Sequence, residues 1–198
     1  MPLIKTIQLR GAQLSIWHIT ESVNELESGL IGGELAVCKG FKSDSRKREF
    51  AASRVMLHCL LSGHEVEYAN SGAPKFKDLN KGLSISHSGD YAICLVSDKQ
   101  SCAVDVEFLA RDISRLKHKF LLQKEQEILG QEKNYIIAWC AKEAAYKFLQ
   151  RENVDFKEHL MVSQLDVNAK TIKILAFSEQ ILPINYLFFQ DLVVAYII

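Results

Sequence analysis

The alternation of apolar and polar residues in the first half of the chain predicts one long helix among short strands. Residues 14–19 alternate as in a strand, and Ser43-Asp44-Ser45 offers N-cap chemistry for a helix that runs to about residue 61. Residues 83–88 and 91–97 flank a Gly89-Asp90 turn and predict a hairpin, and residues 102–108 predict a third strand.

The second half repeats this order of elements in a coarse way. A charged helix is predicted from about residue 114 to 129, and a more apolar helix from about 134 to 149. Strands are predicted near 160–167, 171–177, 186–189 and 192–198. Helices that alternate with runs of antiparallel strands indicate an α+β fold of two similar lobes, which we place at residues 1–100 and 101–198.

The composition of the chain excludes some classes of protein. The 198 residues include 24 Lys plus Arg and 24 Asp plus Glu, so the formal net charge is zero, which disfavours a nucleic-acid coat or a membrane-surface protein. The five cysteines are scattered and odd in number, as expected for reduced thiols in a cytosol. No signal peptide is visible, and the uncharged stretch 180–190 is shorter than the ~20 residues of a membrane helix, so we expect a soluble cytoplasmic protein.

Asp105 and Glu107 form the first candidate site. On a strand they share one face with Ala103, with Cα atoms about 6.5–7 Å apart. Two carboxylates this close suit Mg²⁺, which takes oxygen ligands from a few carboxylates and from substrate phosphate. The alternative is an ordinary solvated strand face.

Glu143 and Lys147 form the second candidate site, one turn apart on the apolar helix. They share an angular sector with Ile136, Trp139 and Cys140, so we expect this face to be buried and its charges to need partners such as a metal and a phosphate. The alternative is an exposed i,i+4 ion pair worth ~0.2–0.5 kcal/mol.

Cations and a histidine in the first half suggest an anion site. His87 lies close to the turn of the predicted hairpin. It is either a histidine of the core or a contact for an anion. Basic residues including Arg48 open the first helix, where a docked anion would relieve their repulsion from the helix dipole. Arg54 falls among apolar positions of that helix and requires a partner.

Four blocks, in this order, resemble the 4′-phosphopantetheinyl transferase superfamily, specifically its larger surfactin-type branch with two pseudo-repeated lobes. They are Gly72-Ala73-Pro74, Ile85-Ser86-His87-Ser88, Val104-Asp105-Val106-Glu107 and the helical block from Trp139 to Lys147. Phe120 and Glu125 resemble the family segment between the last two blocks. Alanine stands at positions 73 and 103, where the family often has lysine and glycine.

The resemblance implies an enzyme that moves the 4′-phosphopantetheine arm of coenzyme A to a serine of an apo acyl or peptidyl carrier protein and releases adenosine 3′,5′-bisphosphate. It implies Mg²⁺ ligands at Asp105, Glu107 and Glu143, with Asp105, Glu143 and Lys147 as the catalytic set. Either Glu143 or a metal-bound water would be the base for the serine. It also implies that coenzyme A is bound by residues of the first lobe, namely Arg48, Arg54, Gly72, Pro74, Lys75, Ser86 and His87.

The resemblance also implies an arrangement. Two lobes related by a pseudo-twofold, each a long helix packed on a small antiparallel sheet, would meet at the active site, with the metal-binding residues in the second lobe. Two lobes in one chain favour a monomer. The alternative is a non-catalytic relative that binds coenzyme A or a carrier protein without transfer.

Overall fold

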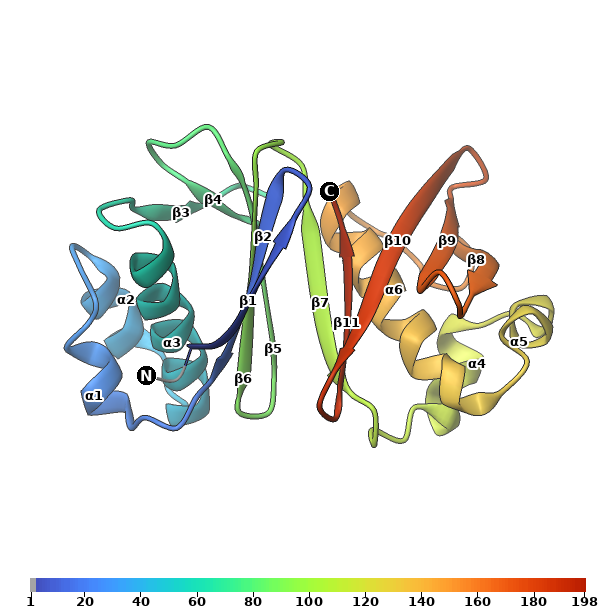
Figure 1. Cartoon of the computed structure of the whole chain (residues 1–198), viewed down its shortest axis with the longest axis horizontal. Coiled ribbons are helices and arrows are strands. Elements are labelled where there is room, and N and C mark those ends of the chain that lie inside the picture. Colours follow the sequence, from blue (N-terminus) through green and yellow to red (C-terminus); the bar gives the residue numbers. More distant parts are fainter. Residues whose placement is uncertain (1–2) are drawn as a thin grey trace. The chain divides into compact units, whose positions relative to one another are not determined.

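The computed structural model describes residues 3–198. Met1 and Pro2, with which the first predicted lobe begins, lie outside the described residues. The chain divides into two compact units, of which the first ends at Ser101 and the second begins at Cys102. We call them the N-terminal and the C-terminal unit (Figure 1).

The N-terminal unit is a four-stranded antiparallel sheet with helices on one face. Its sheet has the order β1-β2-β6-β5, formed by β1 (Leu3–Leu9), β2 (Ala12–His18), β5 (Gly82–Ser88) and β6 (Tyr91–Ser97). The connections contain α1 (Val23–Glu27), α2 (Glu34–Gly40), α3 (Asp44–Leu60) and a small hairpin of β3 (Val66–Tyr68) and β4 (Pro74–Phe76).

The long helix and the hairpin predicted for this unit are confirmed. Ser43 is the N-cap of α3, and its hydroxyl accepts a hydrogen bond from the Arg46 N–H at 3.4 Å. The apolar face of α3 packs on the sheet around Phe50, Met56, Trp17 and Cys94. The strand β1 and the short helices α1 and α2 were not predicted, because elements of five to seven residues give too few turns of periodicity.

The C-terminal unit contains one long helix on a five-stranded antiparallel sheet. The sheet has the order β7-β11-β10-β9-β8, formed by β7 (Ala103–Phe108), β8 (Leu160–Asp166), β9 (Thr171–Ala176), β10 (Gln180–Phe189) and β11 (Leu192–Ile197). The helix α6 (Tyr135–Leu149) lies across it, preceded by the short helices η1 (Ser114–Leu116), α4 (Lys117–Phe120), α5 (Gln123–Leu129) and η2 (Glu132–Asn134).

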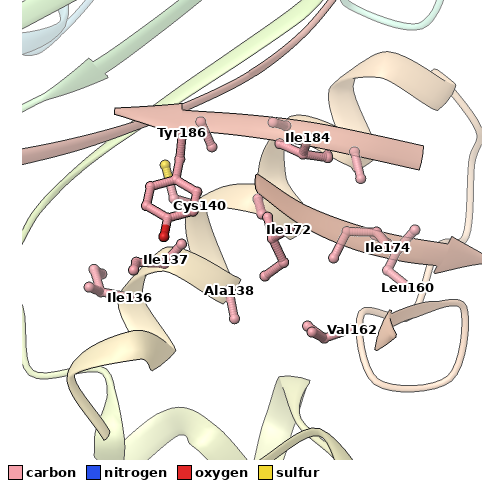
Figure 2. Close-up of a cluster of buried hydrophobic side chains, with 14 of the residues drawn as sticks. Ile136, Ile137, Ala138, Cys140, Leu160, Val162, Ile172, Ile174, Ile184 and Tyr186 are labelled. Atoms are coloured by element: carbon pink, nitrogen blue, oxygen red, sulfur yellow. The ribbon is translucent and has the colours of Figure 1, made fainter. Parts of the chain in front are cut away.

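The core of this unit explains why apolar residues occur on almost every face of α6. Figure 2 shows Ile137, Ala138 and Cys140 of α6 directed toward side chains of the sheet. All three are at most 3% exposed, as are their partners on three strands. Those partners are Leu160 and Val162 of β8, Ile172 and Ile174 of β9, and Ile184 and Tyr186 of β10.

The prediction of one charged helix over residues 114–129 is wrong. The chain is extended at Leu121 and Leu122, and the 3₁₀ turn η1 with the two short helices α4 and α5 replaces the predicted helix. The break follows from a buried ion pair between Glu125 and Lys142, 2.6 Å apart, in which neither side chain is exposed. Glu125 also accepts the Leu122 N–H at 2.7 Å, and Lys142 donates to the Phe120 carbonyl at 2.5 Å. The Leu122 N–H and the Phe120 carbonyl both lie at the break. The break therefore provides hydrogen-bond partners for the two buried charges.

The two units share one topological feature. The strand that precedes the long helix pairs, in each unit, with the last strand: β2 with β6, and β7 with β11. Mixed helices and antiparallel sheets are thus confirmed for both halves of the chain.

Candidate functional site

Asp105 and Glu107 of β7 are buried, with exposed fractions of only 5% and 8%. The strand face that carries them also carries Ala103, which belongs to the core beneath α6. The alternative of a solvated strand face is therefore wrong, because α6 covers the side on which the carboxylates lie. Buried carboxylates need cations or donors, and the structure provides both.

Lys147 of α6 binds Asp105. Its ammonium lies 2.7 Å from the Asp105 Oδ1 and 3.2 Å from the Val104 carbonyl oxygen. The side chain of Lys147 is 30% exposed, and that of Asp105 is 8% exposed. The helix and the edge strand are thus connected through a half-buried ion pair whose cation also reaches solvent.

Glu107 receives two donors at one oxygen. The Trp139 indole N–H donates to its Oε1 at 2.9 Å, and the Arg111 guanidinium donates to the same atom. Arg111 lies in the turn after β7, and its guanidinium carbon stands 5.8 Å from the centre of the Trp139 ring. Trp139, Arg111 and Glu107 therefore form one contiguous group.

Glu143 completes the cluster from α6. Burial raises the pKa of Glu143 to about 7, and the charges of Asp105 and Glu107 act in the same direction, whereas Lys147 and Arg111 lower it. These influences place Glu143 in the same electrostatic environment as both carboxylates of β7. A carboxyl that is half protonated near neutral pH can accept or release a proton there.

The donor set agrees with a Mg²⁺ site in its chemistry, since it offers three carboxylates whose mutual repulsion a divalent cation would relieve. Across residues 3–198, however, no group of three or more His, Cys, Asp or Glu side chains is already arranged to hold a metal ion. Lys147 and Arg111 stand against Asp105 and Glu107 instead. The predicted metal role of Asp105, Glu107 and Glu143 therefore stays a prediction.

In the N-terminal unit, Arg48 connects α3 to the hairpin turn. Its guanidinium donates to the carbonyl oxygens of Ile19 at 2.8 Å and Glu21 at 3.2 Å, and lies 3.3 Å from the Asp90 carboxylate. A third of the side chain is exposed. Arg48 thus has a structural role that explains its position, and it also reaches solvent beside the turn that ends β5.

Arg54 is enclosed, with only 1% of its surface exposed. It donates to the Tyr68 hydroxyl at 2.9 Å, lies 3.6 Å from the Glu34 carboxylate and stands 4.8 Å from the centre of the Phe50 ring. The prediction that Arg54 requires a partner is confirmed. Its predicted contact with coenzyme A is untested, and a ligand would reach it only if Tyr68 or Glu34 moved.

Ser86 and His87 are neighbours on the edge strand β5. The hydroxyl-bearing face of β5 is buried, since Ser84 and Ser86 are each 5% exposed. His87 has the parity of Leu83 and Ile85, which pack on the core beneath α3, and it stands opposite Ala92 of β6. The histidine is half-buried close to the Gly89-Asp90 turn, as the sequence predicts.

Gly72, Pro74 and Lys75 belong to the β3–β4 hairpin. Gly72 has φ +80°, a left-handed conformation that favours glycine, and its N–H donates to the Ala69 carbonyl at 2.8 Å. Pro74 begins β4. Lys75 forms an exposed ion pair with Glu67 at 3.0 Å, a contact of the kind that contributes little to stability and rearranges readily.

Comparison with known proteins shows what the C-terminal unit is similar to. Residues 101–197 match the family model described as the 4′-phosphopantetheinyl transferase superfamily. The chain is also 25% identical over 172 residues to the 4′-phosphopantetheinyl transferase HetI of Nostoc sp., an alignment that covers 74% of this chain and 73% of the relative. Residues 101–197 are therefore similar to the 4′-phosphopantetheinyl transferase superfamily. Members of the superfamily use coenzyme A as a substrate and modify carrier proteins.

The matched segment contains the whole carboxylate cluster. Asp105, Glu107, Glu143 and Lys147 all lie between residues 101 and 197. The residues predicted to bind coenzyme A lie before residue 101, outside the family match. Among the described residues no helix is long and apolar enough to cross a membrane.

Two residues of the matched segment contact the cluster although the sequence does not indicate them as site residues. Arg111 lies four residues after Glu107 but beyond the end of the strand, where spacing says nothing about proximity. The helical spacing places Trp139 on the apolar face of α6, and only the fold shows that its indole N–H reaches a carboxylate. These contacts depend on how α6 packs against β7, so no signal in the sequence alone could have indicated them.

Proposed function

We propose that this chain transfers the 4′-phosphopantetheine arm of coenzyme A to a serine of an apo acyl or peptidyl carrier protein. The serine oxygen attacks the phosphorus that carries the arm, the bond from that phosphorus to the nucleotide oxygen breaks, and adenosine 3′,5′-bisphosphate leaves. The observation that carries the proposal is the cluster of three carboxylates and Lys147 between β7 and α6, inside the segment that matches the superfamily.

The residues of the cluster are suited to separate tasks. Glu143, with a pKa of about 7, can accept the proton of the serine hydroxyl at neutral pH. Lys147 combines a buried anchor at Asp105 with a partly exposed ammonium, which suits contact with a phosphate oxygen. Asp105, Glu107 and Glu143 would hold Mg²⁺, which when bound neutralises charge on the phosphate oxygens. The pH dependence of turnover would decide whether Glu143 or a metal-bound water is the base.

The N-terminal unit would bind coenzyme A. Arg48 and His87 both lie near the Gly89-Asp90 turn, where a guanidinium and an imidazole suit the 3′-phosphate. The β3–β4 hairpin, with Gly72, Pro74 and Lys75, would border the adenine. Ser86 and Arg54 complete the predicted set, although Arg54 needs a rearrangement before it could contact the ligand.

At the level of the fold, we propose the two-lobed, surfactin-type arrangement, with the lobes related by a pseudo-twofold and the active site between them. The shared pairing of the strand before the long helix with the last strand supports two related lobes. A site built from both halves of one chain favours a monomer.

Coenzyme A and an apo carrier protein would be the partners. The carrier could belong to fatty-acid, polyketide or nonribosomal-peptide synthesis. All five cysteines are free, four of them buried, which fits the reducing cytoplasm proposed for the reaction. The competing proposal is a non-catalytic relative, which would bind coenzyme A or a carrier without changing either.

Intact-mass measurement separates these proposals. The chain is incubated with coenzyme A, Mg²⁺ and a panel of apo carrier proteins, and a phosphopantetheine mass gain on a carrier is the expected result. The same mixture with the acceptor serine replaced by alanine should show no gain. Coenzyme A binding without any mass gain on the carriers would favour the non-catalytic relative.

Glu143→Gln supplies the matched variant. It keeps the size of the side chain and removes its capacity to accept a proton, so transfer should fall strongly while coenzyme A still binds. Unchanged transfer by Glu143→Gln would remove Glu143 from the catalytic set.

A further inference from the structure

The Glu107 carboxylate is held at one oxygen by two donors of different kinds. Trp139 supplies a neutral N–H at 2.9 Å, and Arg111 supplies a charged guanidinium to the same Oε1. Glu107 is 8% exposed, so both donors act in a site with little water. Two donors on one oxygen fix the orientation of the carboxylate and leave its second oxygen to face other groups.

The surroundings of the two donors differ. The Trp139 ring is fixed on α6 by aromatic contacts with Phe120 and Phe156, at centroid distances of 5.1 and 5.6 Å. Arg111 lies in the turn after β7, and 44% of its side chain is exposed. The indole is therefore a rigid donor, whereas the guanidinium can leave for water without burying a lone charge.

We propose that Trp139 is the positioning residue that orients Glu107 for the metal, and that Arg111 is a counterion which the metal displaces. This inference rests on the proposed Mg²⁺ role of Glu107. A cation at Glu107 opposes the arrival of a second cation, whereas a neutral N–H imposes no charge repulsion and can remain. The two donors should thus influence metal binding in opposite directions.

Calorimetric titration of MgCl₂ into the chain alone tests the opposite signs. Trp139→Phe keeps a ring and removes the N–H, and it should weaken Mg²⁺ binding by about 10–100-fold, the range typical of groups that orient a metal ligand. Arg111→Gln removes the competing charge, and it should tighten binding by roughly two- to fivefold, the strength of an exposed ion pair. That gain should shrink as the salt concentration rises.

Phe156→Leu is the matched control for packing. It removes an aromatic contact of Trp139 and leaves the indole N–H in place, so the melting temperature should fall while the Mg²⁺ affinity of the folded chain stays the same. Equal losses of affinity in Phe156→Leu and Trp139→Phe would overturn the positioning role, because packing alone would then explain both.

A second measurement leaves Trp139 intact. Trp17 and Trp139 are the two tryptophans of the chain, so Trp17→Phe assigns the remaining indole N–H signal in a nitrogen-15 NMR spectrum. That proton should exchange slowly with solvent both before and after Mg²⁺ is added. Fast exchange once Mg²⁺ is bound would show that Trp139 releases Glu107, which overturns the proposal.

Failure of this inference and failure of the proposed function give different results. Mg²⁺ binding by the wild type that Trp139→Phe leaves unchanged would overturn the positioning role and leave the metal role intact. A wild type that binds no Mg²⁺ would overturn the metal role itself, and this proposal with it. Weaker Mg²⁺ binding by Arg111→Gln would show that Arg111 supports the metal and would overturn its assignment as a competing counterion.

Discussion

The charges of the cluster explain why one carboxyl differs from the other two. Lys147 neutralises Asp105, and Arg111 neutralises Glu107. The third carboxyl, Glu143, then enters a partly buried region next to two anions, so its protonated form is favoured. Two cations and three ionised acids leave the site one positive charge short. A proton can supply that charge, and so can a divalent ion that displaces one of the two cations.

Asp105→Asn should abolish transfer and leave the fold intact. The amide is nearly the same size, and it removes the charge that both Lys147 and a metal would use. A metal ligand should matter more than the about 10–100-fold typical of a group that only orients one. Turnover is compared with that of Asp112→Asn, which changes an exposed aspartate paired with Arg115. Ordinary turnover in Asp105→Asn would exclude this residue from the ligand set.

Glu143 should make the metal-free chain less stable as the pH rises. Its pKa is about 7 in the folded chain, against the ordinary value of 4.5 for a glutamate, so the folded state binds more protons between these values. Stability is therefore highest below pH 4.5 as far as this group is concerned, and it declines up to about pH 7. Glu143→Gln should remove this slope.

Thermal unfolding in EDTA from pH 5 to 8 gives the comparison. The melting temperature of Glu143→Gln relative to wild type should increase with pH and level off above about pH 7. A constant difference across the range would mean that the pKa of Glu143 is not raised.

His87→Ala should weaken coenzyme A binding more than it slows transfer. A hydrogen bond to a charged group contributes about 1.5–3 kcal/mol, and His87 is proposed to contact the 3′-phosphate. Dephospho-coenzyme A lacks that phosphate, so wild type and variant should bind it alike. If the defect persists with dephospho-coenzyme A, His87 contacts another phosphate or supports the core.

At the scale of elements, the buried Glu125–Lys142 pair determines where α4 ends and α5 begins. Glu125 accepts the N–H groups of Leu122 and Val162, at 2.7 and 2.8 Å, and so connects α5 to β8. Lys142 donates to the carbonyl oxygens of Phe120 and Phe156. Burial lowers the pKa of Lys142, against the opposing effect of Glu125.

Glu125→Ala should therefore destabilise the chain by about 3–5 kcal/mol, because it leaves the Lys142 charge buried and unpaired. Replacing Lys142 by Met in the same chain should recover part of this loss. Urea unfolding monitored by circular dichroism measures both variants. A double variant less stable than Glu125→Ala would show that Lys142 retains other partners of equal strength.

The elements that could be predicted are those with long periodicity or strong turn chemistry. The helices α3 and α6 and the β5–β6 hairpin belong to this group, as does the shared face of Asp105 and Glu107. The break at Leu121 could not be predicted, because it depends on Lys142, a residue on another helix. The Glu107 donors depend in the same way on the packing of α6 against β7.

At the scale of the whole molecule, all residues of the proposed site belong to one chain, so the proposal requires no second copy. We therefore expect a monomer in sedimentation experiments and a transfer rate per chain that does not depend on enzyme concentration. A specific rate that increases with concentration would indicate that a second chain contributes to the site.

The cysteines also have a practical consequence. Cys59 on α3 is exposed, whereas Cys38, Cys94, Cys102 and Cys140 are buried, and burial raises the pKa of the Cys102 thiol to about 12. Thiolates are the reactive form, so a maleimide dye should label the native chain at one position. A single fluorophore at Cys59 offers an attachment point for single-molecule or surface-immobilised assays without mutagenesis.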